Sequence, residues 1–350
     1  MRSAVAALAL IAAVPAVAAQ TSFFKLKSAT VLPGKSPEYD YLTYEPTHKY
    51  LVMGRRDDGV FVYDTVARKL VRKIVKSEGA NAAILVPSLA RGFTTNEDGS
   101  TTVFALPGYG LIKRIKFAGD ADAAVFDPVT RQVAFLSGDS KRITLIDART
   151  LALTGVIAMA SSKLEGAAAD GQGGIFVAER DRAMVARIDL KKRAVTAEWP
   201  TTGCVQPTGL AFDSGHHRLF LGCRGSAPVM AILDSDSGRV VATPEIGRGN
   251  DGVAYDPVHG RIFTTNGVDS NLVIFHQDDP DHYRLEQALT TRPGARTIAF
   301  DAVGERVFTV AAEGIVDPSQ PVNTGPAAFY PNRFTDDSFT VLEISRKTAH

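Results

Sequence analysis

The chain has 350 residues, of which 45% are hydrophobic and 22% charged, with a formal net charge of +1 at pH 7. A near-neutral balance without a Lys/Arg-dense block gives little reason to expect nucleic acid as a partner. Gly and Pro are abundant, at 30 and 18 residues, and no compositional break separates two halves. The composition is therefore typical of one all-β domain, and a chain of this length can bury a large core without metals.

The first 19 residues have the layout of a secretory signal peptide. Arg2 supplies the positive charge, residues 4–14 form the apolar run, and small residues precede a cleavage site after Ala19. We predict that residues 20–350 form the mature chain and that it is periplasmic or secreted. No later apolar run reaches the ~20 residues of a membrane-spanning helix, so we expect no membrane span.

Ahead of the repeats, residues 23–32 (FFKLKSATVL) have the pattern of an isolated strand. The last repeat ends with a strand-like segment at 339–344 and lacks a fourth strand of its own. We predict that residues 23–32 supply the outermost strand of the last blade and so close the fold. Closure pairs both ends of the chain in one sheet and removes an exposed edge, and we expect a monomer.

Seven similar segments follow one another along the chain. Each places one residue at the turn after its first strand: Glu45, Val86, Asp127, Asp170, Asp213, Asp256 and Asp301. Their spacings of 41, 41, 43, 43, 43 and 45 residues are typical of WD40-like, four-stranded propeller blades and not of helical repeats. We predict an all-β, seven-bladed β-propeller with strands A to D in each blade.

Polar residues recur at the turns of these blades. Four aspartates stand where strand C gives way to strand D, and their carboxylates can hold Asx-turns: Asp64, Asp147, Asp189 and Asp234. Three histidines fall at equivalent places in the A-to-B turns, which indicates blade geometry: His48, His217 and His259. Zinc hydrolysis and triad chemistry lack support, because neither HExxH nor GxSxG occurs.

Two segments of the sixth repeat carry a family resemblance. RIFTTN at 261–266 and SNLVIF at 270–275 are similar to the RLYVTN…NTVSVID repeat of YncE-like, YVTN-type propellers, and RGFTTN at 91–96 is a weaker match. The resemblance extends over the mature chain through the repeat period, the signal peptide and the ending SFTVL at 338–342. It implies an exported seven-bladed propeller with binding or scaffolding roles, and it transfers no catalytic residue.

The loops that enter strand A and leave strand B of a propeller lie on one face, around the central channel. The residue five positions before each turn residue is polar in all seven repeats: Asp40, Asn81, Asp122, Glu165, Thr208, Asp251 and Arg296. We predict that they form a ring at the channel mouth. The ring can simply line a water-filled channel. Alternatively, it binds a ligand, with four carboxylates holding Ca²⁺, another divalent cation or a cationic group, and Arg296 orienting an anionic group: Asp40, Asp122, Glu165 and Asp251.

Further residues are expected on the same face. The B-to-C loops and the last blade supply a charged rim: Arg55, Arg56, Arg180, Arg224, Tyr330 and Arg333. Cys204 and Cys223 flank this face in the fifth blade, and in an exported protein we predict a disulfide between them. The last blade carries 22 extra residues within 314–336, which can lie across the opening as a lid or dock a partner.

Two functions are compatible with these features. The first is a binding scaffold of the cell envelope that holds a small ligand, a peptide or a partner protein, which agrees with the lack of a catalytic constellation. The second is a metal-assisted lactonase or lyase, in which channel carboxylates hold a divalent ion that polarises a carbonyl. Glu165 or Asp122 would then act as base, provided that its neighbours raise its pKa.

Overall fold

The structure is a computed structural model that describes residues 23–35, 38–117, 119–225, 227–320 and 331–346. The predicted signal peptide (residues 1–19) and Tyr330 of the predicted rim lie outside the described residues. The described part contains strands and two single-turn 3₁₀ helices, Pro87–Leu89 and Arg180–Arg182, and no α-helix. None of its helices is long and apolar enough to cross a membrane.

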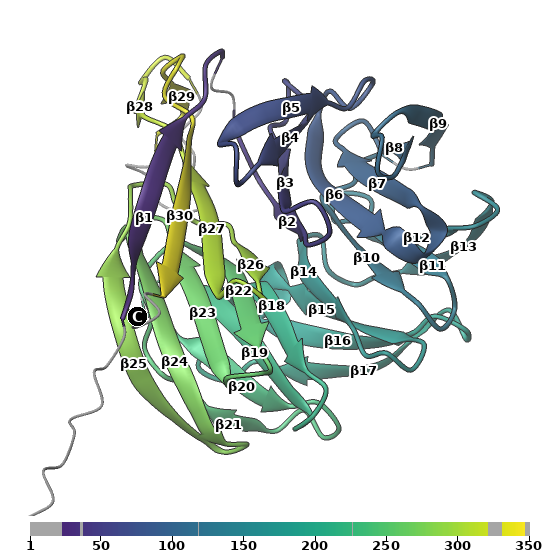
Figure 1. Cartoon of the computed structure of the whole chain (residues 1–350). Helices are drawn as coiled ribbons and strands as arrows, with labels where there is room; N and C mark the ends of the chain where they lie inside the picture. The colour runs from purple at the N-terminus through teal and green to yellow at the C-terminus, as the bar shows by residue number, and fades with distance from the viewer. Residues whose placement is uncertain (1–22, 36–37, 118, 226, 321–330, 347–350) are drawn as a thin grey trace, which may run out of the picture.

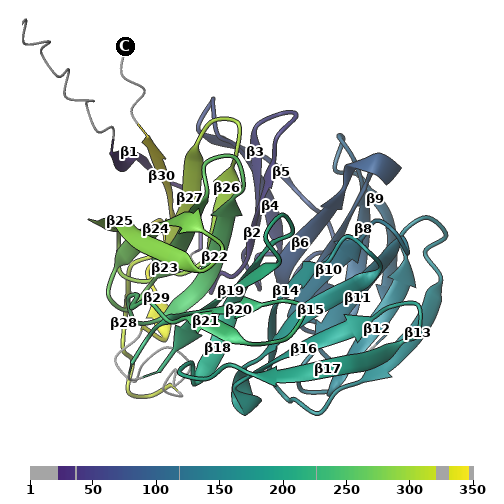
Figure 2. The ribbon, with the colours of Figure 1, turned by 90° about the horizontal axis from the view of Figure 1, so that it is seen from below.

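Seven four-stranded sheets follow one another around a central axis, which confirms the predicted seven-bladed propeller (Figures 1 and 2). Blade 1 comprises β2 (Leu42–Glu45), β3 (Tyr50–Gly54), β4 (Val60–Asp64) and β5 (Lys69–Lys73). Blade 2 comprises β6 (Ala80–Val86), β7 (Arg91–Asn96), β8 (Ser100–Ala105) and β9 (Leu111–Lys116). Blade 3 comprises β10 (Ala123–Asp127), β11 (Gln132–Ser137), β12 (Arg142–Asp147) and β13 (Leu153–Ala158). Blade 4 comprises β14 (Leu164–Ala169), β15 (Gly174–Glu179), β16 (Met184–Asp189) and β17 (Ala194–Pro200). Blade 5 comprises β18 (Gln206–Asp213), β19 (Arg218–Arg224), β20 (Met230–Asp234) and β21 (Val240–Ala242). Blade 6 comprises β22 (Asn250–Asp256), β23 (Arg261–Asn266), β24 (Asn271–Asp279) and β25 (His282–Thr290).

Blade 7 joins the two ends of the described chain, as the sequence predicted. Its sheet has the order β26 (Ala299–Asp301), β27 (Arg306–Ala311), β30 (Thr340–Arg346) and β1 (Phe24–Val31). β1 runs antiparallel to β30, with Phe24 opposite Arg346 and Val31 opposite Thr340. Figure 1 shows the purple β1 beside the yellow β30. The propeller is therefore closed by its N-terminal strand.

The hydrophobic core lies between neighbouring blades. The second strand of six blades contributes one phenylalanine that is at most 1% exposed: Phe93, Phe135, Phe176, Phe220, Phe263 and Phe308. Aromatic side chains bury a large apolar area on a flat sheet face, so one ring per blade fills the space against the next sheet. This periodic core holds the inner strands around the channel in fixed positions.

The turn residues behave as the repeat pattern predicted. Oδ1 of Asp147, for example, accepts the backbone N–H groups of Arg149 and Thr150 at 2.9 and 2.7 Å, and the other three C-to-D aspartates also bind two turn N–H groups each. In the A-to-B turn of blade 6, Nδ1 of His259 lies 2.7 Å from the carboxylate of Asp256. These side chains stabilise the turns, which confirms their structural interpretation.

The two cysteines form a disulfide with a Cα–Cα distance of 5.5 Å, at the end of blade 5 that carries the loop into β18. The two cysteines are 19 positions apart in the sequence. For a loop of this size the chain-entropy model gives a stabilisation of the folded state of about 3 kcal/mol. We expect the double variant Cys204→Ala/Cys223→Ala to unfold several degrees below the native chain in calorimetry. A reductant should lower the melting temperature of the native chain and leave that of the variant unchanged. Equal melting temperatures for both chains would contradict this expectation.

The insertion in blade 7 contains structure that the sequence did not indicate. β28 (Gly314–Ile315) pairs antiparallel with β29 (Arg333–Phe334), so the insertion starts and ends as a short ribbon. Residues 321–330 lie outside the described residues. The interpretation of the insertion as a lid or docking segment therefore stays a prediction.

Candidate functional site

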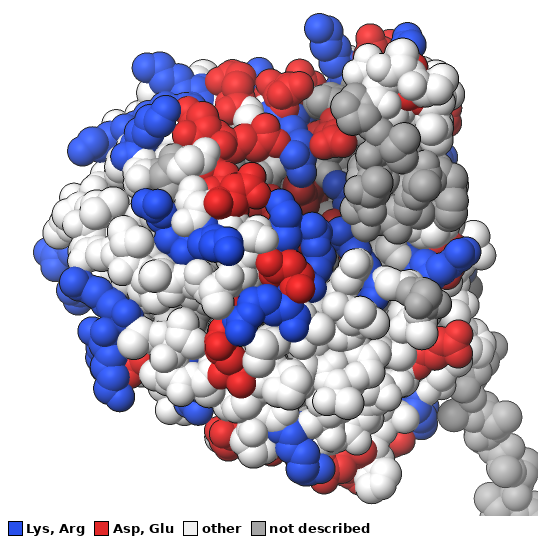
Figure 3. Space-filling view, turned by 180° about the vertical axis from the view of Figure 1, so that it is seen from behind, with Lys and Arg blue, Asp and Glu red and all other residues white. Residues whose placement is uncertain are grey.

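One mouth of the channel opens into a cavity of about 640 Å³, which we call the funnel. Six of the seven predicted ring residues line it: Asp40, Asn81, Asp122, Glu165, Asp251 and Arg296. Charged residues of the surrounding loops complete the wall, and Figure 3 shows Asp and Glu side chains gathered around a hollow on this face, with Arg and Lys among them. The structure therefore brings these six side chains together around one polar cavity.

The innermost strands hold the ring side chains in place. The backbone N–H of Asp40 donates to Gly54 O at 3.1 Å, and that of Asp122 donates to Leu136 O at 3.0 Å, so both residues extend their strand pairing toward the mouth. Asn81, Glu165 and Asp251 lie within β6, β14 and β22 themselves. These three residues sit at register shifts of their strand pairs, so the pairing on either side of each shift holds the backbone beneath their side chains.

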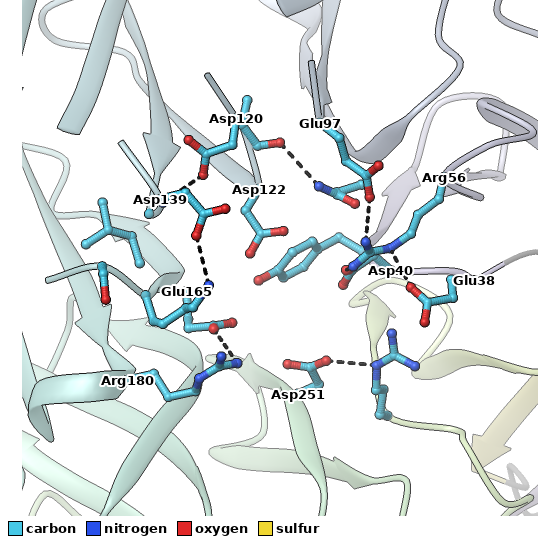
Figure 4. A pocket seen from close by; sticks show the side chains of 18 of the residues that line it. Glu38, Asp40, Arg56, Glu97, Asp120, Asp122, Asp139, Glu165, Arg180 and Asp251 are labelled. Carbon is cyan, nitrogen blue, oxygen red and sulfur yellow. Dashed lines mark hydrogen bonds and ion pairs between the residues drawn. The ribbon is translucent and has the colours of Figure 1, made fainter. Parts of the chain in front are cut away.

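Two of the ring carboxylates are neutralised by arginines of the rim. Nη2 of Arg56 lies 3.1 Å from Oδ2 of Asp40, and Nη1 of Arg180 lies 2.6 Å from Oε1 of Glu165 (Figure 4). Burial raises the pKa of Asp40, partly offset by Arg56. Burial likewise raises the pKa of Glu165 to about 7, against the opposing effect of Arg180. Both carboxylates are desolvated, and their arginines compensate only part of that cost.

Asp251 stands between two arginines at the opposite side of the ring. Nε of Arg296 donates to its Oδ2 at 2.9 Å, and Arg224 contacts its Oδ1. The side chains are nearly buried, with 7% exposed for Asp251, 7% for Arg224 and 11% for Arg296. Burial would raise the pKa of Asp251, but Arg224 and Arg296 outweigh it and lower the pKa below its usual value. We call these three residues the Asp251 cluster.

Asp122 differs from the other ring carboxylates because it forms no ion pair with any described residue. Burial raises its pKa well above the usual value, and the carboxylates of Asp40 and Glu165 raise it further. Figure 4 shows its carboxylate pointing into the open centre of the ring, across from Asp251. Arg56 opposes this shift without forming an ion pair, so Asp122 is the ring carboxylate that has no direct cationic contact among the described residues.

Tyr41 is a site residue that the sequence analysis missed. It lines both the funnel and a second cavity of about 420 Å³ deeper in the channel, and it packs against the apolar cluster between blades 3 and 4. Burial raises its pKa well above the usual value, and Asp122 adds to the shift. The aligned positions in the other repeats carry small side chains: Ala82, Ala123, Gly166, Gly209, Gly252 and Thr297. The sequence signal for Tyr41 was therefore one large aromatic residue at a repeat position that otherwise carries small residues.

Tyr41 stands at the boundary between two chemically different chambers. Below it the channel is lined by apolar or small side chains such as Leu42, Ala83, Val125 and Leu210. Above it the wall carries the charged ring. Tyr41 and Asp251 line both cavities, so they lie where the polar funnel passes into the apolar part of the channel.

Some predicted residues lie elsewhere. Arg55 does not lie on the rim: it is 1% exposed and its guanidinium sits 4.9 and 4.5 Å from the ring centres of Phe61 and Phe339. Thr208 does not line the funnel, since its hydroxyl contacts Gly222 O and Asn250 O at 3.2 and 3.1 Å. The guanidinium of Arg55 therefore packs against two aromatic rings, and the hydroxyl of Thr208 binds two backbone carbonyls, instead of facing the channel.

The remaining rim residues divide into two groups. Arg56, Arg180 and Arg224 line the funnel. Arg333 is not among its lining residues; its side chain is 67% exposed and pairs with Asp317 at 3.4 Å. The arginines that reach the funnel therefore come from blades 1, 4 and 5, whereas the blade 7 insertion contributes Gln320 and Asn332 to the lining.

The carboxylates of the ring do not form a ready metal site. Among the described residues, no group of three or more His, Cys, Asp or Glu side chains is placed to hold a metal ion. Ca²⁺ requires six to eight oxygen ligands, whereas three of the four ring carboxylates here are already bound to arginines. Three of the four carboxylates would have to leave their arginines to bind the predicted divalent cation, which stays a prediction.

Comparison with known proteins gives the fold. No family model and no curated protein sequence matches the chain. Among solved structures it is similar to the RRP9 WD40 repeats (TM-score 0.75, 9% identity, 92% of this chain and 100% of that one). It also resembles a chain of a mitotic checkpoint complex (0.70, 13%, 88% and 96%) and one of Kuenenia stuttgartiensis hydrazine synthase (0.66, 13%, 79% and 94%). At these identities the likeness shows a seven-bladed, WD40-like propeller.

Proposed function

We propose that this chain is an exported, YncE-like propeller of the YVTN type that acts as a binding scaffold and uses the funnel as its recognition site. The carrying observation is the funnel itself, a cavity of about 640 Å³ whose charged walls are held by ion pairs. This volume lies in the range of small-molecule sites, roughly 300–1,000 Å³. A site with fixed side chains loses little entropy on binding, which favours recognition of a specific ligand or peptide side chain.

Two features support export. The N-terminal sequence has the layout of a signal peptide, with a predicted cleavage after Ala19. The disulfide between Cys204 and Cys223 fits an oxidising compartment such as the periplasm or the cell exterior. We therefore propose that the mature chain works in the cell envelope or outside the cell.

The structural neighbours are compatible with a scaffold role. They do not indicate which ligand the channel residues bind. One of them belongs to a mitotic checkpoint complex, which is a protein assembly, and another to a hydrazine synthase. The same propeller shape thus occurs in both contexts, so function follows from the loops and side chains around the channel. The funnel here carries charged groups for binding, and the histidines that pair with turn carboxylates belong to the turns instead.

One observation favours the enzyme alternative. The raised pKa of Glu165, about 7, is suited to a general acid or base at neutral pH. We therefore include a lactone hydrolysis assay, with and without added Ca²⁺, among the tests of function. Turnover abolished by Glu165→Gln would support the lactonase alternative over the scaffold.

The binding role is tested by blocking the funnel from its rim. Asp139 lines the funnel and its side chain is 74% exposed, so Asp139→Trp adds bulk there without disturbing the core. We expect polar small molecules or peptides that raise the melting temperature of residues 20–350 to lose this effect in the variant. A ligand present at about 100 times its Kd stabilises by about 2.7 kcal/mol, which a thermal-shift scan resolves.

Asp139→Asn provides the matched control, because it removes the charge without filling the mouth. Ligands that bind both variants equally well would place recognition outside the funnel. A screen in which neither compounds nor peptides bind the native chain would contradict the proposed function altogether.

A further inference from the structure

The charges of the funnel are unevenly compensated. Its described lining carries eight carboxylates and five cationic side chains. Arg180, Arg224 and Arg296, of blades 4, 5 and 7, are ion-paired with Glu165 and Asp251, whereas Asp122, on blade 3, forms no ion pair with any described residue. An excess of negative charge in a concave polar site attracts a cation and disfavours an anion.

A second, independent feature beside Asp122 also requires a donor. Asn81 lines the funnel and is 2% exposed, and its Oδ1 has no hydrogen-bond partner in the described structure. Its Nδ2 donates to Ala121 O at 3.3 Å, so this amide contacts the residue that directly precedes Asp122. A buried carbonyl oxygen without a donor is destabilising, so a ligand N–H group that reaches it gains a favourable hydrogen bond.

The floor beneath these two residues is aromatic. Tyr41 lies close enough to Asp122 for that carboxylate to be the strongest charged influence on the pKa of its phenol, after burial. Aromatic rings attract ammonium groups through their faces, and a phenol oxygen can accept a hydrogen bond from one. One carboxylate, one amide oxygen and one tyrosine thus offer complementary contacts to a single cationic nitrogen.

We propose that the funnel binds a small organic cation through a protonated amine that ion-pairs with Asp122 and donates to Asn81 above Tyr41. This inference rests on the proposed binding role and specifies its ligand class. A protonated amine donates up to three hydrogen bonds to separate acceptors, which matches this set. Rim carboxylates that are 43% and 44% exposed extend the negative field outward, so a second ammonium group at the far end of the ligand is also favoured: Glu38 and Glu97.

Ionisation of Asp122 links this binding to pH. Its pKa is raised, and the groups facing it are Asp40, Glu165, Asp251 and Arg56. A bound cation favours the ionised carboxylate, so binding releases a proton while Asp122 is protonated in the free chain. Affinity should therefore increase with pH as long as the ligand amine itself stays protonated.

Titration calorimetry on residues 20–350 with putrescine and spermidine tests the inference, with the uncharged 1,4-butanediol and the anionic succinate as chemical controls. We expect both amines to bind and both controls to stay silent at millimolar concentration. Asp122→Asn keeps the shape and removes the charge, so it should weaken amine binding about 10- to 100-fold. Asn81→Ala should weaken it by a smaller factor.

Asp139→Asn is the matched control, because it removes a carboxylate of the same funnel whose side chain is exposed and paired with Lys163 at 2.9 Å. It should alter amine affinity by less than about threefold. Equal losses for Asp122→Asn and Asp139→Asn would overturn the inference in favour of diffuse electrostatic attraction. The melting temperature of each variant shows whether it is folded, and an unaltered amine affinity in folded Asp122→Asn would likewise overturn it.

Failure of this inference is distinguishable from failure of the proposed function. Binding of succinate instead of the amines, or displacement of the amines by CaCl₂ alone, would reject the amine site and keep a functional funnel. If no amine binds at millimolar concentration, the inference fails, while ligands from the Asp139→Trp screen can still support the scaffold. If neither the amine titration nor the ligand screen detects binding, both the amine site and the proposed scaffold function are rejected.

Discussion

Replacing Asp251 by asparagine is expected to lower the free energy of unfolding by about 3–5 kcal/mol. The change leaves Arg224 and Arg296 facing each other with their side chains 7% and 11% exposed and without the carboxylate that binds both. Two nearly buried cations then lose the carboxylate they share, and water reaches them poorly. Denaturant unfolding of the variant and the native chain measures the loss as a shift in the transition midpoint.

An exposed ion pair of the same funnel gives the comparison. Asp139→Asn breaks the contact with Lys163, whose side chain is 46% exposed, and should change stability by less than about 1 kcal/mol. A similar small effect for Asp251→Asn would mean that Arg224 and Arg296 are well solvated, contrary to their burial. If the change in m-value were large, the two-state comparison itself would need revision.

The Asp251 cluster also bears on the shape of the funnel. Arg224 donates through Nε to Asn250 O at 2.9 Å, and Arg296 donates to Tyr39 O at 2.6 Å. These bonds tie the cluster to the backbone of β22 and to the segment that precedes β2, so the closing blades are joined across the mouth. The cluster therefore fixes the positively charged side of the site, opposite Asp122.

The repeat period allowed the fold to be predicted in detail. The turn residues recur every 41 to 45 residues, and the missing fourth strand of blade 7 pointed to residues 23–32, which β1 confirms. Local chemistry explains this success, because the Asx-turns around Asp147 and its equivalents are made within a few residues of sequence. Turns of this kind can therefore be predicted from the residues that form them.

The site could be predicted only in part, because its chemistry depends on contacts between blades. The alignment placed six residues around the mouth, yet it did not indicate that Arg180 binds Glu165 or that Asp122 has no such partner. Thr208 and Arg55 have the right repeat position, but their side chains find partners in the interior instead. Side-chain pairing across blades is a property of the three-dimensional arrangement that a one-dimensional period does not contain.

Replacing Phe24 by alanine is expected to lower the free energy of unfolding by about 3–5 kcal/mol, because it removes a buried ring from the closing strand. Phe24 is 3% exposed and packs edge-on against Phe263 of blade 6, with ring centres 5.3 Å apart. Its backbone exchanges two hydrogen bonds with the Gln287 side chain, at 2.9 and 2.7 Å. The ring thus joins blade 7 to blade 6, and thermal unfolding should show a large fall in melting temperature.

Lys25→Ala is the matched control, since that neighbouring side chain is exposed and its loss should change stability by less than about 0.5 kcal/mol. Deletion of residues 24–31 goes further, because it leaves the whole edge of β30 unpaired. We expect this truncated chain to self-associate through the open edge, which light scattering after size exclusion detects. A truncated chain that stays monomeric and melts with the native chain would show that the propeller is held closed by the contacts of its inner strands, without the N-terminal strand.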